Sequence, residues 1–148
     1  MSSTGYPTGS TGSNAQGRFP MGRIRRAGLA AIAAAVAANA VAWGVARALL
    51  DISDDFVPLA TIWPTAIFTA LFLAAGVGVF AGLNRSTAKP IPRFWQIAFT
   101  ILILTLLSPL AARAQEGATS AAILTLEALH IVAFAVFVPL FTRLVRRT

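Results

Sequence analysis

Four apolar stretches, separated by short polar connections, fill nearly all of the chain after residue 26. They cover residues 27–50, 59–83, 94–112 and 119–141. The hydrocarbon core of a bilayer is about 30 Å thick and a helix rises about 1.5 Å per residue, so about 20 apolar residues cross it. The pattern therefore predicts an all-α polytopic membrane protein, an antiparallel bundle of four transmembrane helices within a domain of residues 23–148.

The first 22 residues have a different composition, rich in Ser, Thr, Gly and Pro. Such a segment cannot bury enough apolar surface to offset the entropy lost on ordering, so residues 1–22 are predicted to be a disordered tail. Met21, directly before the first span, is a second possible translation start, and the sequence leaves the choice between Met1 and Met21 open.

A signal peptide is the competing interpretation of the first apolar stretch. Basic residues precede an Ala-rich run, and Ala38-Asn39-Ala40 has the small-x-small form of a cleavage site. The apolar run continues through residues 41–50, however, which is longer than a signal core. We therefore expect a retained span; cleavage would leave three spans in the same orientation.

The basic residues are distributed asymmetrically around the four stretches. Ten of the twelve Lys and Arg residues lie before the first span, between the second and third, or after the fourth: Arg18, Arg23, Arg25, Arg26, Arg85, Lys89, Arg93, Arg143, Arg146 and Arg147. The other two connections carry Asp51, Asp54, Asp55 and Glu116 beside Arg47 and Arg113. Because short cytoplasmic connections carry the excess of Lys and Arg, both termini are predicted to be cytoplasmic.

Composition narrows the functional classes. The chain is 57% hydrophobic with a mean hydropathy of +0.74, and it has no cysteine, which excludes disulfides, iron–sulfur clusters and thiolate zinc sites. The net charge of +7 flanks the spans, where it meets lipid headgroups, so we do not expect a nucleic-acid partner. The preference for Arg over Lys and the abundance of Ala suggest a bacterial protein, and hence the cytoplasmic membrane.

Rows of small residues at four-residue spacing predict how the first two helices pack, because small side chains let helix backbones approach in lipid. One row is Ala30, Ala34, Ala38, Ala42 and Ala46, and the other is Ala66, Ala70, Ala74, Gly78 and Gly82. The sequence predicts that these rows face each other, although an Ala-rich helix also contains such a row by chance.

Polar side chains within the spans are candidate functional residues, since they are expensive to bury in hydrocarbon. They are Glu127, His130, Asn39 and Arg47, and Thr69, Thr105 and Ser108 fall in the same layer as Asn39. Glu127 and His130 are three residues apart and share a helix face. They are interpreted as a structural pair, a proton-handling or substrate site, or cofactor ligands, whereas Arg47 is expected to pair with the acidic connection.

No complete catalytic or metal-binding motif is present in the sequence. A di-metal site needs two Glu-x-x-His motifs, and the chain has one, although a homodimer could supply two axial His130 ligands to a haem. The leading hypothesis is a non-enzymatic scaffold, accessory subunit or envelope protein without a cofactor. The alternatives are a proton-coupled transporter or channel using Glu127 and His130, and a redox or haem-binding subunit using His130. The expected partners are the lipid bilayer and either further copies of the chain or another membrane protein.

The last two spans resemble a family of uncharacterised bacterial four-helix membrane proteins, classed as a domain of unknown function. The resemblance is carried by Leu106-Leu107-Ser108-Pro109-Leu110 and by Ala128-Leu129-His130-Ile131-Val132, followed by Pro139 and a basic end. It extends over about residues 24–147. The resemblance implies the four-helix topology and a histidine early in the last helix, which His130 matches, and it implies no activity.

Overall fold

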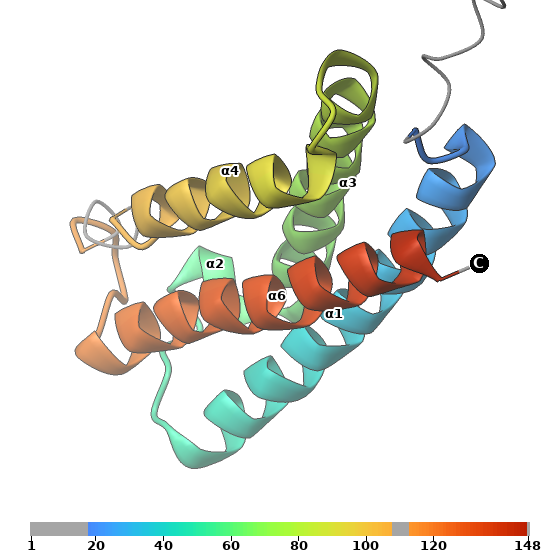
Figure 1. Ribbon diagram of the computed structural model, residues 1–148. Coiled ribbons are helices and arrows are strands. Elements are labelled where there is room, and N and C mark those ends of the chain that lie inside the picture. The colour runs from blue at the N-terminus through green and yellow to red at the C-terminus, as the bar shows by residue number, and fades with distance from the viewer. Residues whose placement is uncertain (1–17, 108–112, 148) are drawn as a thin grey trace, which may run out of the picture.

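The computed structural model describes residues 18–107 and 113–147, and within these ranges the chain is helical and contains no strand (Figure 1). The helices are α1 (Met21–Leu49), the short α2 (Val57–Ala60), α3 (Ile62–Ser86), α4 (Pro90–Thr105) and α6 (Ser120–Arg146). The all-α class predicted from the sequence is therefore confirmed.

Three of these helices, α1, α3 and α6, are long and apolar enough to cross a membrane. The fourth, α4, has 16 residues and is shorter, about 24 Å at the usual rise per residue. The third predicted span extends to residue 112, but its helix ends at Thr105 and residues 108–112 lie outside the described part of the chain. Within the described residues, α4 therefore accounts for the first part of the predicted span, and the rest of the prediction falls on residues that the structure does not describe.

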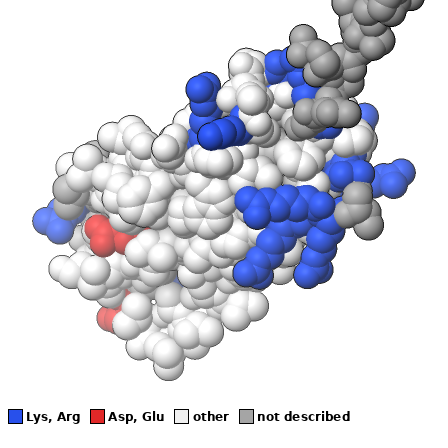
Figure 2. Space-filling model, in the orientation of Figure 1, with Lys and Arg blue, Asp and Glu red and all other residues white. Residues whose placement is uncertain are grey.

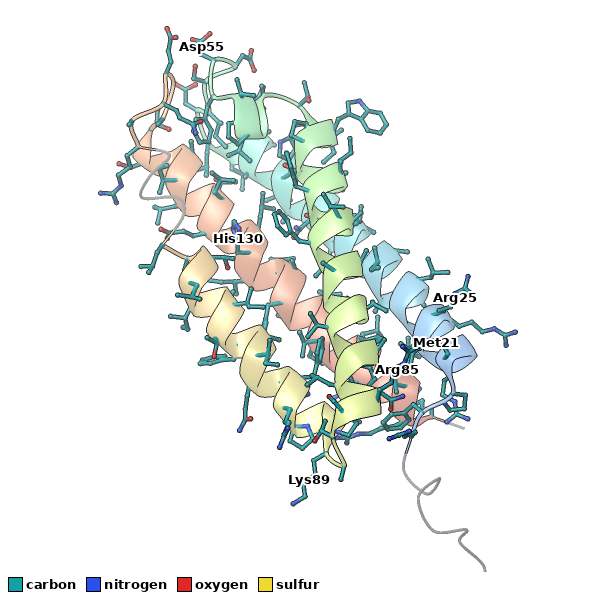
Figure 3. All side chains as sticks on the ribbon, turned by 90° about the horizontal axis from the view of Figure 1, so that it is seen from above. Met21, Arg25, Asp55, Arg85, Lys89 and His130 are labelled. Carbon is teal, nitrogen blue, oxygen red and sulfur yellow. The ribbon has the colours of Figure 1, made fainter. Side chains whose placement is uncertain are left out.

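The two ends of the molecule differ in charge. Met21, Arg25, Arg85 and Lys89 lie at one end, which we call the basic end, and Asp55 lies at the opposite, acidic end (Figure 3). The space-filling view shows most of the visible Lys and Arg side chains gathered on one side of the face and the acidic side chains on the other, beside one basic group (Figure 2). The separation of charge that the sequence predicts is present in three dimensions.

Phenylalanine rings hold the basic end together. The ring of Phe80 in α3 meets Phe94 of α4 and Phe141 of α6 edge to face, with centroids 5.4 and 5.0 Å apart. Phe19 and Phe137 complete this group, which we call the phenylalanine cluster. Such rings stabilise the fold through the apolar area that they bury, and each well-oriented pair adds about 0.5–1.5 kcal/mol.

The acidic end has its own apolar core, built from the connections. Ile52, Phe56 and Leu59 pack with Ala122, Ile123 and Leu129 at the start of α6. Gly117 has φ of +71°, and a Cβ there would lie 2.8 Å from the backbone nitrogen of Phe56. A glycine is therefore required at this position for the two connections to touch.

The predicted tail ends at residue 22, but the structure describes residues 18–22, and these residues pack against or belong to the helical domain. Phe19 lies against Phe80, with ring centroids 6.0 Å apart, and α1 begins at Met21. Pro20 precedes the helix and fixes the backbone direction from which it starts. A single phenylalanine in a polar segment is a weak signal of packing, so the sequence pattern alone does not include Phe19 in the helical domain. Residues 1–17 lie outside the described part.

The predicted small-residue rows are not the most deeply buried faces of α1 and α3, although Ala42 and Ala46 of the first row pack against the core at the acidic end. In α1 the buried row is Ala27, Ala31, Ala35 and Asn39, about 100° around the helix from the predicted row, in which Ala34, Ala38 and Ala42 are half-buried and Ala30 is exposed. In α3 the predicted row is exposed at Ala74, Gly78 and Gly82 and half-buried at Ala66 and Ala70.

The phenylalanine cluster explains why the predicted small-residue row of α3 faces outward. Phe80 must face inward, and Gly78 and Gly82 are each two residues away, which is about 200° around a helix. A Cβ at either glycine would meet nothing within 4 Å. The glycine that does touch a neighbouring helix is Gly28, where a Cβ would lie 2.8 Å from Cγ2 of Val77.

We expect Gly28→Leu to lower the free energy of unfolding by about 1–3 kcal/mol, because the added side chain collides with Val77 and separates α1 from α3. Gly78→Leu is the matched control: it should leave stability unchanged or raise it slightly, since leucine favours the helix more than glycine. Thermal unfolding in detergent measures both. Equal losses in the two variants would contradict the packing described above.

Candidate functional site

A cavity of about 790 Å³ lies between α3, α4 and α6, with α1 reaching it through Asn39. Most of its lining is apolar and rich in aromatic rings, including Phe68, Phe72, Phe94, Phe134 and Phe137. The polar lining residues are Asn39, Thr65, Thr69, Thr105, Gln115 and His130. The cavity is therefore an apolar site with a few polar groups, the usual character of a small-molecule pocket.

The fold explains why the cavity exists. A short turn joins α3 to α4 (Figure 1), and the phenylalanine cluster fills the space between the helices at that end. Farther along, the facing positions carry small residues: Ala75 and Gly76 on α3, Ala98 on α4 and Ala133 on α6. Small side chains leave the space between diverging helices unfilled.

Asn39 is the most deeply buried polar group of the cavity wall, with 2% of its surface exposed. Its Nδ2 donates a hydrogen bond to Oγ1 of Thr69 at 3.0 Å, which joins α1 to α3. Its Oδ1 is buried and has no hydrogen-bond partner. A buried acceptor without a partner costs about 1–3 kcal/mol.

His130 contributes a second polar group from the middle of α6 (Figure 3). Its Nδ1 lies 2.7 Å from the carbonyl oxygen of Leu126, one turn earlier in the helix. Because a carbonyl only accepts, Nδ1 carries the proton of this hydrogen bond, and Nε2 is the ring nitrogen that does not take part in it. The side chain is half-buried.

The predicted pairing of Glu127 with His130 does not form. The imidazole bonds to its own helix backbone, and none of the side-chain hydrogen bonds or ion pairs between described residues includes the Glu127 carboxylate. Glu127 is half-buried and is not among the residues that line the cavity. The backbone carbonyl one turn back lies closer to the ring nitrogen than the Glu127 side chain does, so the three-residue spacing was not sufficient evidence for a pair.

The other predicted polar residues are distributed as follows. Arg47 bonds to the carbonyl oxygen of Ile52 at 2.8 Å and pairs with the Asp54 carboxylate, as expected for a residue at the edge of the acidic connection. Thr69 and Thr105 line the same cavity as Asn39, while Ser108 lies outside the described residues. In the described ranges no three His, Cys, Asp or Glu residues are grouped as a metal site.

Asn84, near the end of α3, is a buried polar residue that the sequence pattern does not single out. Its side chain is buried and holds the backbone of Phe19 with two hydrogen bonds: Phe19 N donates to Oδ1 at 2.9 Å, and Nδ2 donates to Phe19 O at 3.0 Å. The available signal was its position four residues after Phe80, which places the two on one helix face.

Comparison with known proteins identifies the family. The chain matches DUF6069, a family of unknown function, over residues 19–147, and it therefore belongs to that family. This agrees with the resemblance drawn from the last two spans. No curated protein and no solved structure matches the chain.

The two buried asparagines should respond differently to replacement by leucine. Asn84→Leu should lower the free energy of unfolding by about 1–3 kcal/mol, because it leaves two backbone groups of Phe19 unpaired. Asn39→Leu should change stability by less than about 1 kcal/mol, because it removes one hydrogen bond together with an unsatisfied acceptor. Thermal unfolding in detergent tests the pair. A larger loss for Asn39→Leu would show that Asn39 is mainly structural.

Proposed function

We propose that this member of the DUF6069 family is a multi-pass protein of the bacterial cytoplasmic membrane that binds one lipophilic molecule between α3, α4 and α6. Its role is non-enzymatic, that of an accessory or envelope protein. The observation that carries the proposal is the apolar cavity of about 790 Å³, whose size lies within the usual range for small-molecule sites.

The outer surface supports placement in a bilayer. Large apolar side chains outside the cavity are exposed around the long helices, among them Leu29, Val41, Leu71, Leu104, Leu124 and Ile131. A soluble monomer seldom exposes so much continuous apolar surface, whereas lipid tails solvate it without penalty.

The antiparallel four-helix arrangement is part of the proposal. Lengths of 29, 25 and 27 residues suffice for α1, α3 and α6 to span the bilayer. The 16 residues of α4 would complete a span together with Leu106, Leu107 and the apolar residues that follow. The basic end, with ten Lys and Arg residues in its flanking segments, is the cytoplasmic end under the rule that cytoplasmic connections are positive.

The composition of the wall favours binding over catalysis. Among the described residues that line the cavity, His130 is the one titratable side chain. General acid–base and nucleophilic mechanisms need two or more reactive groups within hydrogen-bond reach of each other. Because Glu127 does not reach the cavity, the same observation argues against proton-coupled transport through a Glu127–His130 pair.

Orientation can be tested with single cysteines, because the natural chain has none. In spheroplasts, a membrane-impermeant maleimide should label Asp55→Cys at the acidic end and should leave Lys89→Cys unlabelled until the membrane is permeabilised. The expected difference in labelling is at least several-fold. Labelling of Lys89→Cys alone would reverse the proposed topology.

The binding role can be tested with two neighbouring alanines of α3. Ala75 and Ala74 are both exposed, but Ala75 lines the cavity and Ala74 does not. Native mass spectrometry of the purified protein should detect one bound lipophilic molecule. Ala75→Phe should reduce the loaded fraction several-fold by filling the cavity, and Ala74→Phe should leave it unchanged. An equally loaded Ala75→Phe protein, or wild-type protein that carries nothing, would refute the proposal.

A further inference from the structure

We infer that the cavity binds a single hydrocarbon chain of a membrane lipid, which lies along the helices with its head group at the acidic end and its terminal methyl group beside the phenylalanine cluster. This inference rests on the proposed function, and it names the chemical class and the orientation of the molecule bound at that site.

The cavity is long and narrow. Its lining on α3 runs from Thr65 to Val79, which is about 21 Å along the helix. A helix of that length, about 10 Å wide with its side chains, would occupy about 1,600 Å³. The cavity of about 790 Å³ is therefore too small for a helix of a partner protein. An extended peptide would leave its backbone groups unpaired against an apolar wall, whereas a hydrocarbon chain has no such groups.

The cavity opens sideways, between the helices. Phe68 and Phe72 on α3 and Ile101 on α4 line it and are also exposed, Phe72 by 70%. The opposite wall belongs to α6, where Leu129 and Phe137 are buried. Phe72 lies about 15 Å from the start of α3, which under the proposed topology is close to the middle of the hydrocarbon core. The molecules that meet this opening are therefore lipid chains.

Polarity changes along the cavity and gives the chain its direction. The polar lining residues lie in the part nearest the acidic end: Thr65 and Thr69 early in α3, Thr105 at the end of α4, Gln115 in the connection that follows, and Asn39 and His130. Beyond Phe72 on α3, before Ile101 on α4 and beyond His130 on α6, every described lining residue is apolar. A lipid chain is polar at one end only, so burying its polar linkage beside the phenylalanine cluster would cost more than placing it at the acidic end.

The length of the cavity matches a chain from one leaflet. Each leaflet supplies about half of the hydrocarbon core, or about 15 Å. A chain of this length that starts beside Thr65 would end about 20 Å from the acidic end, at the level of Ala75 and Ala133. The lining continues to Val79 and Phe137, which leaves room for a longer chain of about 21 Å.

Fit is the source of selectivity, because a hydrocarbon chain gains nothing by leaving other hydrocarbon for an apolar wall. A short chain leaves part of the lining without contacts, and each lost contact forfeits dispersion energy. A chain that is too long pushes its polar linkage out past the acidic end. The cavity should therefore prefer one range of chain lengths.

Chain length is the first test. The protein is purified in glyco-diosgenin, a detergent with a rigid steroid body in place of a linear chain, and incubated with an equimolar mixture of saturated lysophosphatidylcholines. Mass spectrometry then quantifies the bound lipids. We expect one lipid per protein, with binding tightest at about 16 carbons, the chain that spans one leaflet. A chain of about 10 carbons should bind at least about 5-fold more weakly, because it leaves the apolar end unfilled.

Two alanines of α6 provide a matched pair of variants. Ala133 lines the cavity about 20 Å from the acidic end, so Ala133→Phe should shorten the cavity by about 6 Å and move the preferred length to chains about four to six carbons shorter. Ala135 is exposed on the same helix and is not among the residues that line the cavity. Ala135→Phe should keep the wild-type preference.

Photolabelling of the wild-type protein tests the orientation. A lysophosphatidylcholine with a diazirine at the end of its chain should label the peptides that contain Phe94 and Phe134, and an excess of the unlabelled lipid should remove this label. Labelling confined to the peptides around Thr65 and Gln115 would contradict the orientation.

The outcomes separate this inference from the proposed function. Equal binding of all chain lengths, or an unshifted preference in folded Ala133→Phe, would overturn the assignment of a lipid chain, while a lipophilic molecule retained on purification would still support the proposed function. If Ala133→Phe does not fold, the chain-length profile and the photolabelling of the wild-type protein decide. If no lipid binds and the protein also purifies without a bound molecule, both the inference and the proposed function fail.

Discussion

The edge-to-face contacts of the Phe80 ring determine how the helices are arranged. They join α3 to α4 and α6 at the basic end, where the chain turns from α3 into α4. With Phe80 inward, the rotation of α3 about its axis is set, and the small residues that might have packed against α1 face outward instead. The contact between α1 and α3 then depends on Gly28 and Val77.

The same constraint leaves the cavity open. Large rings fill the space between the helices at one end, and the connections build a second core at the other. Between these two cores the cavity wall combines small residues, such as Ala75 and Gly76, with the rings of Phe68, Phe72 and Phe134. A site held by packed cores on both sides loses little conformational freedom when a ligand binds, which lowers the cost of binding.

Sequence patterns predicted the helices well because bilayer thickness and helix rise translate directly into the length of an apolar run. They also singled out Asn39 and His130, which line the cavity, since polar residues are conspicuous in an apolar stretch. They could not predict the rotation of α1, because alanine occupies both the row beginning at Ala27 and the row beginning at Ala30. The cavity was out of reach as well, because it depends on how α3, α4 and α6 diverge and no local pattern encodes that divergence.

The hydrogen bonds between Asn84 and Phe19 couple the ends of two helices. If residues 18–20 were removed, every described helix would keep its residues, but the Asn84 side-chain amide would lose both of its partners. The segment before α1 therefore restrains the first turn of that helix and the last turns of α3 together, so fraying at either helix end exposes the same buried amide.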